Sequence, residues 1–260
     1  MKSLKSTLRA RQPTIGSWLN YSYEATTEFM AKAGFDWLVV DMEHSANTSA
    51  SLYRSLQVIE LAGTVPVVRV GANDPLLIKH ALESGAHGII VPMINSAAEA
   101  RRAAEAVHYP PRGTRGVGLW RAQGYGTSFE HYREWASREL VFLAQIEHWR
   151  AVEELEEILA LDLVDGFIIG PYDLSGSLGE PGNFQNPAYV RCLEKVERIA
   201  KSHAKPAGFH LVHPDPEGRA LREKLDAGYT FIAYGTDMIF FTSRVASEAR
   251  RLKEAGYLSS

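Results

Sequence analysis

Two acids and a histidine fall within four consecutive positions of the sequence, from Asp41 to His44, directly after an apolar run. A carboxylate beside an imidazole is the arrangement of a general base with its supporting acid, and Asp41 would favour the protonated form of His44. Each residue also has a structural alternative, because an acid after a strand can cap the next helix and a histidine can be a satisfied core group.

Four more polar side chains stand at or just past the ends of other apolar runs, namely Arg69, Gln145, Glu147 and Asp173. Glu147 and Asp173 offer the oxygen ligands that Mg²⁺ or Mn²⁺ prefers, with water and substrate oxygens completing the octahedron. Arg69 offers a planar fork for a carboxylate or an oxyanion, or it pairs with Glu43. A metal ion, an arginine and a histidine base together suit removal of a proton next to a carbonyl group.

These side chains need a fold that brings strand ends together. Eight short apolar runs alternate with longer segments at helical spacing, which indicates parallel strands covered by helices and, with eight strands, a closed (β/α)8 barrel. A doubly wound open sheet is the alternative, but no Gly-x-Gly-x-x-Gly follows the first strand. The expected strands are 15–19, 35–41, 65–70, 87–93, 141–147, 165–170, 206–212 and 230–235.

Glycines mark the ends of four predicted helices, at Gly34, Gly63, Gly85 and Gly228. In a (β/α)8 barrel the active site lies at the C-terminal ends of the strands, where all the polar residues above are expected to meet. No lysine stands at such an end, which argues against a Schiff-base aldolase. The expected helices are 24–34, 50–63, 74–85, 96–107, 151–160, 187–203, 216–228 and 242–257.

One long segment, 109–128, has no clear strand and is rich in glycine, proline and arginine. Loops of this length in compact domains are often functional, and the alternative is a linker between domains. We expect one barrel domain over 1–260, because apolar strands continue on both sides of the segment.

Composition narrows the class of protein. The formal net charge is −3, so the basic excess typical of nucleic-acid binding is absent. The single cysteine, Cys192, excludes an internal disulfide and fits a reducing compartment. The charged N-terminus has no apolar core of signal-peptide length, and no window approaches about 18 apolar residues. We therefore expect a cytoplasmic protein with no membrane span.

Several motifs together resemble a known family over nearly the whole chain and in order. They are "DMEHSANT", "PVVRV", "GAHGIIVPMINSAAEA", "YPPRGTRGVG", "QIEH", "GPYDLSGSLG" and "AGYTFIAYGTDMIFF". They resemble the HpcH/HpaI aldolases, which are metal-dependent class II pyruvate aldolases of 2-keto-3-deoxy acid metabolism. The resemblance implies a (β/α)8 barrel whose last helix is exchanged with a neighbouring subunit, in a homohexamer.

The resemblance implies that Glu147 and Asp173 bind the metal ion, which pyruvate would chelate through its carbonyl and carboxylate groups. Backbone N–H groups near Tyr172 and Asp173 would also bind the pyruvate carboxylate, and Gln145 would lie beside the site. The metal could be Mg²⁺, Mn²⁺ or Co²⁺, because carboxylates and a keto acid accept all three.

The resemblance implies that Arg69 contacts the carbonyl oxygen and steadies the enolate, while His44, paired with Asp41, moves the proton. The reaction would reversibly cleave a 4-hydroxy-2-keto acid to pyruvate and an aldehyde. The identity of the aldehyde, the direction of the reaction in the cell and the choice of metal stay open.

The chain departs from the family at positions near the expected aldehyde. Trp120, Arg121 and Tyr125 lie in a loop that differs, and they would either shape the aldehyde pocket or pack a subunit contact. His213, at the predicted rim, would touch the aldehyde. His210 and His148 also differ from the usual pattern. We interpret His210 as a core residue, and His148 either as support for Glu147 or as a surface residue.

Two other functions remain from the sequence. A citrate-synthase-like or acyl-CoA lyase-like enzyme would use the same enolate chemistry on a thioester. A barrel that binds a keto acid without turning it over is the non-catalytic alternative. The intact set of Asp41, His44, Arg69, Glu147 and Asp173 argues against the latter.

Overall fold

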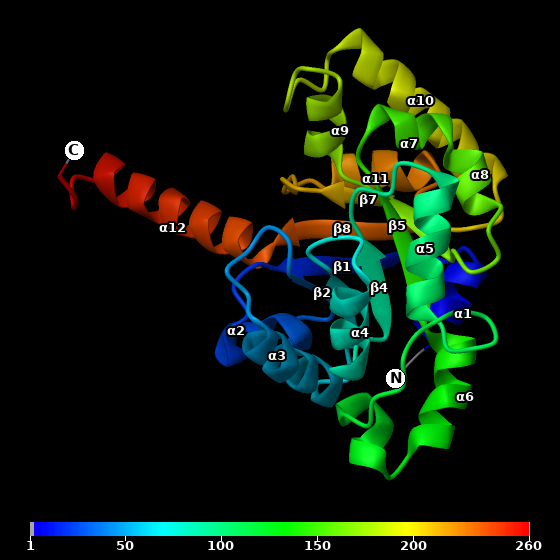
Figure 1. Ribbon diagram of the computed structural model, residues 1–260. Coiled ribbons are helices and arrows are strands. Elements are labelled where there is room, and N and C mark those ends of the chain that lie inside the picture. Colours follow the sequence, from blue (N-terminus) through cyan, green and yellow to red (C-terminus); the bar gives the residue numbers. More distant parts are fainter. Residues whose placement is uncertain (1–2, 260) are drawn as a thin grey trace.

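The computed structural model describes residues 3–259 and forms a closed barrel of eight parallel strands, with β8 pairing back onto β1 (Figure 1). The predicted (β/α)8 barrel is confirmed, and every strand begins and ends within two residues of the predicted positions. The strands are β1 (Thr14–Leu19), β2 (Trp37–Asp41), β3 (Val65–Arg69), β4 (Gly88–Val91), β5 (Val141–Ile146), β6 (Gly166–Ile169), β7 (Ala207–Leu211) and β8 (Phe231–Thr236).

Helices surround the barrel, and every predicted helix is present. The predicted helix 151–160 is split in two, because Glu154 leaves helical geometry at φ −96° and ψ 12°. The helices are α1 (Leu4–Arg9), α2 (Glu24–Lys32), α3 (Ser49–Leu61), α4 (Pro75–Glu83), α5 (Ala97–Val107), the 3-10 helix η1 (Arg121–Gly126), α6 (Phe129–Glu139), α7 (Trp149–Glu153), α8 (Leu155–Leu159), α9 (Pro171–Ser177), α10 (Pro187–Ser202), α11 (Arg219–Asp226) and α12 (Asp237–Glu254).

Local sequence explains where the helices begin and end. Thr48 caps α3 by accepting a hydrogen bond from the Ser51 amide, and Asp74 caps α4 just before a proline at the first helical position. The four glycines predicted as helix ends all have positive φ, between 86° and 110°, which is the left-handed conformation that terminates a helix.

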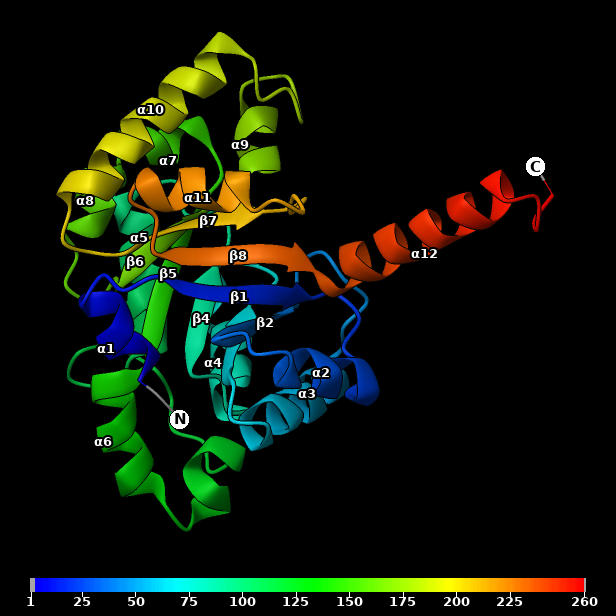
Figure 2. The ribbon, with the colours of Figure 1, turned by 180° about the vertical axis from the view of Figure 1, so that it is seen from behind.

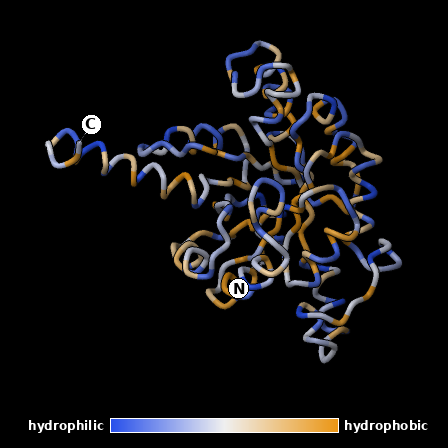
Figure 3. Tube along the Cα trace, turned by 60° about the vertical axis from the view of Figure 1, so that its left-hand side comes forward, coloured by the Kyte–Doolittle hydropathy of each residue, from blue (hydrophilic) through white to orange (hydrophobic). Residues whose placement is uncertain are grey.

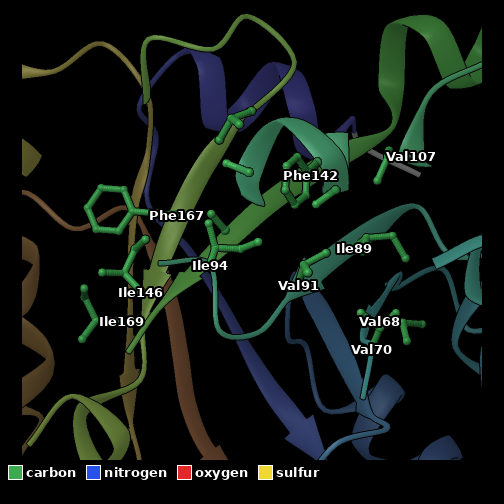
Figure 4. Close-up of a cluster of buried hydrophobic side chains, with 14 of the residues drawn as sticks. Val68, Val70, Ile89, Val91, Ile94, Val107, Phe142, Ile146, Phe167 and Ile169 are labelled. Carbon is green, nitrogen blue, oxygen red and sulfur yellow. The ribbon is translucent and has the colours of Figure 1, made fainter. Parts of the chain in front are cut away.

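The side chains of the strands alternate between two cores. One core fills the inside of the barrel, and the other lies between the strands and the helices, where Val68, Ile89 and Phe142 pack (Figure 4). Along the chain, hydrophobic residues are concentrated toward the centre of the molecule (Figure 3). Helix α1 lies across the N-terminal end of the barrel and adds Leu4 and Leu8 to the inner core (Figure 2). One end of the barrel is thereby filled, and the C-terminal end is left for a site.

Segment 109–128 lies between β4 and β5, which pair directly with each other in the barrel. The segment contains η1 near its end, and α6 follows it before β5 begins. Sequence patterning missed α1, η1, α6 and α9, which are short or carry few apolar side chains.

Helix α12 leaves the barrel and points into solvent (Figures 1 and 2). Only its first residue, Asp237, is buried, and Met238, Phe241 and Val245 are 41%, 65% and 50% exposed. Beyond the first turn, the apolar side chains of this helix therefore do not pack on its own barrel. In residues 3–259, the structure contains no helix long and apolar enough to cross a membrane.

Candidate active site at the C-terminal mouth of the barrel

Asp41 and Arg69 lie opposite each other in register at the ends of β2 and β3. Their ion pair is bidentate, with Arg69 Nε donating to Asp41 Oδ1 at 2.9 Å and Nη2 donating to Oδ2 at 2.6 Å. The third guanidinium nitrogen, Nη1, lies 3.2 Å from Glu43 Oε2, and the group stacks 4.3 Å from the Trp18 ring centroid. The guanidinium is therefore held on three sides.

Asp41 is buried and receives further donors from the Asn20 side chain at 2.8 Å and from the backbone amides of Glu43 and His44. Burial raises the pKa of Asp41, but the Arg69 guanidinium and the backbone donors outweigh it and hold the pKa below its usual value. Asp41 is a permanent carboxylate that positions Arg69.

The predicted side-chain pair between Asp41 and His44 does not form. Both Asp41 oxygens are taken by Arg69, because β3 places that residue in register beside β2. The His44 imidazole is 59% exposed at the mouth, and its Nε2 lies 3.8 Å from Glu43 Oε2. The neighbour of the imidazole is thus Glu43, to which sequence analysis assigned no catalytic role.

Glu43 is a half-buried carboxyl among other acids. Burial raises its pKa to about 7; Arg69 opposes this rise, and the negative charges of Glu147, Asp41 and Asp173 add to it. These groups share one small region at the mouth, where negative charge exceeds the positive charge of Arg69.

Glu147 and Asp173 face the same space from the ends of β5 and the first turn of α9. A Cβ atom built on Gly170 would lie 3.1 Å from Glu147 Oε2 and 3.6 Å from Asp173 Oδ2. Glycine at this position therefore keeps the space between the two carboxylates open. Burial raises the pKa of Glu147, while hydrogen bonds from Gln145 and Met93 lower it.

The segment that follows β4 contributes a backbone group to the site, although it has no titratable side chain. The Met93 amide donates to Glu147 Oε1 at 2.5 Å, and Met93 has a φ of 53°, a left-handed conformation that is rare for a residue with a side chain. Gln145 donates to the other Glu147 oxygen, Oε2, as expected for a residue beside the site. Glu147 is thereby fixed in one orientation.

Across residues 3–259, no cluster of three or more His, Cys, Asp and Glu side chains is arranged to hold a metal ion. A site built on Glu147 and Asp173 would therefore take its remaining ligands from water and substrate. The oxygen donors, the excess of negative charge and the space beside Gly170 fit a hard divalent cation.

Tyr172 lies in the first turn of α9, and its ring packs edge-on against Phe184, with 5.1 Å between ring centroids. Its side chain therefore turns toward the loop before α10. The first turn of a helix has no intrahelical acceptors for its N–H groups, so the amides of Tyr172 and Asp173 are available to an anion.

The residues predicted for the aldehyde pocket do not meet at the mouth of their own barrel. Arg121 pairs with Glu60 on α3 and donates to the Ser84 carbonyl at the end of α4 at 2.9 Å. Trp120 and Tyr125 pack against Tyr53 on the outer face of α3. The pocket expected from these three residues is not formed within one chain.

The three histidines take different places. His213 is exposed in the loop after β7, as expected for a rim residue. His148 caps α7, with Nδ1 accepting from the Arg150 amide at 3.2 Å, and is therefore a structural residue at the edge of the site. His210 lies inside the barrel, with its ring centroid 5.2 Å from that of Trp18.

Two residues of the site were missed from the sequence. Asn20 directly follows β1, so the rule that strand ends line the site would have found it. Trp18 points into the barrel beneath Arg69, and the alternation of side chains in β1 was the available signal.

Comparison with known proteins places this geometry in a family. The family model of the HpcH/HpaI aldolase/citrate lyase family matches residues 14–243. A curated relative from Escherichia coli O6:H1, named 5-keto-4-deoxy-D-glucarate aldolase, is 34% identical over 251 residues, which is 96% of each chain.

Two solved structures agree with this match. An HpcH/HpaI aldolase/citrate lyase family protein from Burkholderia cenocepacia J2315 has a TM-score of 0.90 and 32% identity, covering 97% of this chain and 100% of that one. An HpcH/HpaI aldolase from Desulfitobacterium hafniense DCB-2 has a TM-score of 0.87 and 30% identity, covering 98% of both. The chain belongs to the HpcH/HpaI aldolase/citrate lyase family and is a carbon-carbon lyase of the aldolase type.

Proposed function

We propose that the protein is a metal-dependent aldolase that reversibly cleaves a 4-hydroxy-2-keto acid to pyruvate and an aldehyde. The observation that carries this proposal is the fixed Arg69 guanidinium at the same mouth as two carboxylates, Glu147 and Asp173, that face one open space. A purely structural cluster would balance these charges, whereas here the acids outnumber their single cationic partner.

Glu147 and Asp173 would hold a divalent cation, with Mg²⁺, Mn²⁺ and Co²⁺ as the candidates. When bound, such an ion supplies a Lewis acid that polarises a keto-acid carbonyl. The hydrogen bonds from Gln145 and Met93 keep Glu147 in place for this task. The amides of Tyr172 and Asp173 would bind the substrate carboxylate.

Arg69 would stabilise the negative charge that develops on the carbonyl oxygen when the enolate forms. Its orientation is set before substrate arrives, because Asp41, Glu43 and the Trp18 ring already hold it. Preorganised charge of this kind needs no rearrangement during the reaction, which is the main way in which enzymes lower such barriers.

His44 would move the proton. Its exposed imidazole is free of Asp41 and lies at the rim, where it can reach substrate or a water molecule. Asp41 supports catalysis through Arg69 rather than through His44.

The chemical class of the substrate is supported by the name of a curated relative. The curated relative is named for a keto sugar acid, which supports a hydroxylated 2-keto acid as the substrate here. The second candidate is citrate-synthase-like or acyl-CoA lyase-like chemistry, which the family description also covers.

We also propose that α12 packs on a second copy of the chain, in a homohexamer. The support is the exposed apolar side of this helix, formed by Met238, Phe241 and Val245. Sedimentation or light scattering at several concentrations would test this, and a monomer at micromolar concentration would contradict it.

The function is tested by incubating the protein with pyruvate and glycolaldehyde, in Mg²⁺ or Mn²⁺ and in excess chelator, and following the product by NMR. Metal-dependent formation of a 4-hydroxy-2-keto acid is the expected result. Release of free CoA from acyl thioesters, with no product from pyruvate, would instead support the second candidate.

A further inference from the structure

His210 occupies the floor of the mouth. Its neighbours in β7, Phe209 and Leu211, belong to the core between strands and helices, so alternation turns His210 into the barrel. The ring contacts Trp18, which in turn stacks on Arg69. The small side chain of Ala233 lies opposite His210 in β8.

The imidazole is neutral and one of its nitrogens lacks a partner. Burial, together with the charge of Arg69, lowers the pKa of His210 to about 3, so the ring carries one proton at neutral pH. In the described part of the chain, the buried Nε2 atom makes no hydrogen bond. Leaving such an atom unpaired is unfavourable, so a ligand or water is expected there.

The unpartnered nitrogen is an acceptor. The backbone of Gly235 favours a proton on the ring, and Nε2 makes no hydrogen bond, so we assign the proton to Nδ1. Arg69 does not supply the missing donor in the described structure: its nitrogens contact Asp41 and Glu43, and Nε2 of His210 makes no hydrogen bond. His210 Nε2 therefore requires an external donor.

We propose that His210 Nε2 accepts a hydrogen bond from a hydroxyl group on the aldehyde half of the substrate, so that the enzyme selects hydroxyaldehydes over their deoxy isosteres. This inference rests on the proposed aldolase function. The pyruvate half offers a carboxylate, a carbonyl and a methyl group, none of which donates a hydrogen bond. The hydroxyl at the cleaved carbon is common to all substrates, so the selecting hydroxyl lies on the next carbon.

The test compares two aldehydes of equal size, glycolaldehyde and propionaldehyde, each with saturating pyruvate and metal. The wild-type protein should favour glycolaldehyde in kcat/KM. His210→Leu should lower that preference by roughly 5- to 150-fold, the effect of one buried hydrogen bond. His210→Gln, whose amide oxygen can reach the position of Nε2, should keep part of the preference.

His108→Leu is the matched control. His108 is also buried, has a pKa lowered to about 4 and an unpartnered Nε2, but lies at the opposite end of the barrel near Lys5 and Asp165. Its substitution should leave the ratio of the two kcat/KM values unchanged.

A wild-type protein that uses both aldehydes equally would overturn the inference, and so would a His210→Leu protein in which both rates fall by the same factor. If His210→Leu does not fold, His210→Gln provides the test. An equal fall of kcat/KM for both aldehydes in that variant would indicate a structural role of His210. No product with either aldehyde would contradict the proposed function itself, and this inference with it.

Discussion

At the N-terminal end of the barrel, the buried Lys5 ammonium lies 2.9 Å from Asp165 and donates to the Leu140 carbonyl at 2.7 Å. At the C-terminal mouth, Glu43, Glu147 and Asp173 share a guanidinium that is already bound to Asp41 in a bidentate pair. Positive and negative charges are thus matched at the N-terminal end, whereas negative charge is in excess at the C-terminal mouth.

The difference separates stability from function. A matched, buried pair such as Lys5–Asp165 holds α1 against the barrel, and breaking it exposes a lone charge to a nonpolar surrounding. Acids held close together at the mouth oppose folding of the metal-free chain, as the raised pKa values of Glu43 and Glu147 indicate. Such a cost is typical of sites where a ligand later supplies the missing charge.

The largest expected effect comes from the carboxylates at the mouth. Glu147→Gln and Asp173→Asn should each remove the metal-dependent part of the aldol rate, because each takes away one of the two protein ligands that we propose for the metal ion. The melting temperature of the metal-free protein should stay equal or rise, since repulsion between the acids decreases. A normal aldol rate in both variants would contradict the metal assignment.

His44→Ala should lower the aldol rate by about 10²–10⁴-fold, the usual contribution of a proton-transferring group. Stability should not change, because the imidazole is exposed. The control is His131→Ala, which removes another exposed histidine, on α6 and away from the mouth. Equal rates in the two variants would exclude His44 from proton transfer.

Arg69→Lys keeps the charge but loses the planar fork that grips Asp41. We expect a fall of about 10²–10³-fold that appears mainly in kcat, because the guanidinium stabilises charge that develops only during the reaction. A change confined to KM for pyruvate would mean that Arg69 only binds substrate. Arg69 also tests the comparison between the two ends of the barrel, because its loss should lower the aldol rate and the stability of the fold together.

Asp165→Asn probes the opposite end. It leaves Lys5 buried without its counter-ion and should cost about 3–5 kcal/mol of unfolding free energy in urea titrations. The aldol rate per folded molecule should be unchanged, because Asp165 lies far from the mouth. A large loss of the aldol rate with normal stability would contradict the claim that the N-terminal end of the barrel serves stability and the C-terminal mouth serves catalysis.

The smallest effect is a pH dependence of the metal-free protein. Glu43 has a folded pKa of about 7 against 4.5 in the unfolded chain, so the folded state holds its proton more tightly. The corresponding stability is present below pH 4.5 and is lost as the pH rises through 7. Glu43→Gln mimics the protonated form and should show a shallower decline across this range in chelator. Identical declines would contradict the raised pKa.

Much of this arrangement was predictable from the sequence, because parallel strands bring distant strand ends to one surface. Periodicity located β2, β3 and β5, and the rule about barrel mouths then selected Arg69 and Glu147. Pairing within the site was predictable only in part. The contact of Arg69 with Glu43, one of the two alternatives, is present, but the pair of Arg69 with Asp41 was not predicted. Asp41 is close to His44 in sequence, yet the register between β2 and β3 gives both of its oxygens to Arg69.

Backbone contributions were also hidden from sequence analysis. The Met93 amide donates to Glu147 from a left-handed backbone conformation, which a methionine in the sequence does not predict. Likewise, the loop with Trp120 and Arg121 was expected near the aldehyde because it departs from the family pattern, but its path over α3 is set by contacts with Glu60 and Tyr53. Such long-range contacts appear only once the chain is folded.

The central claim is that the mouth forms an enolate from pyruvate with the help of a divalent cation. The most direct measurement is the exchange of the pyruvate methyl protons for deuterium in D₂O, followed by NMR, with Mg²⁺ or Mn²⁺ and with excess chelator. The account predicts fast exchange that needs the metal, persists in Asp165→Asn and is lost in Glu147→Gln. Exchange that ignores the chelator, or its complete absence in the metal-loaded wild-type protein, would contradict it.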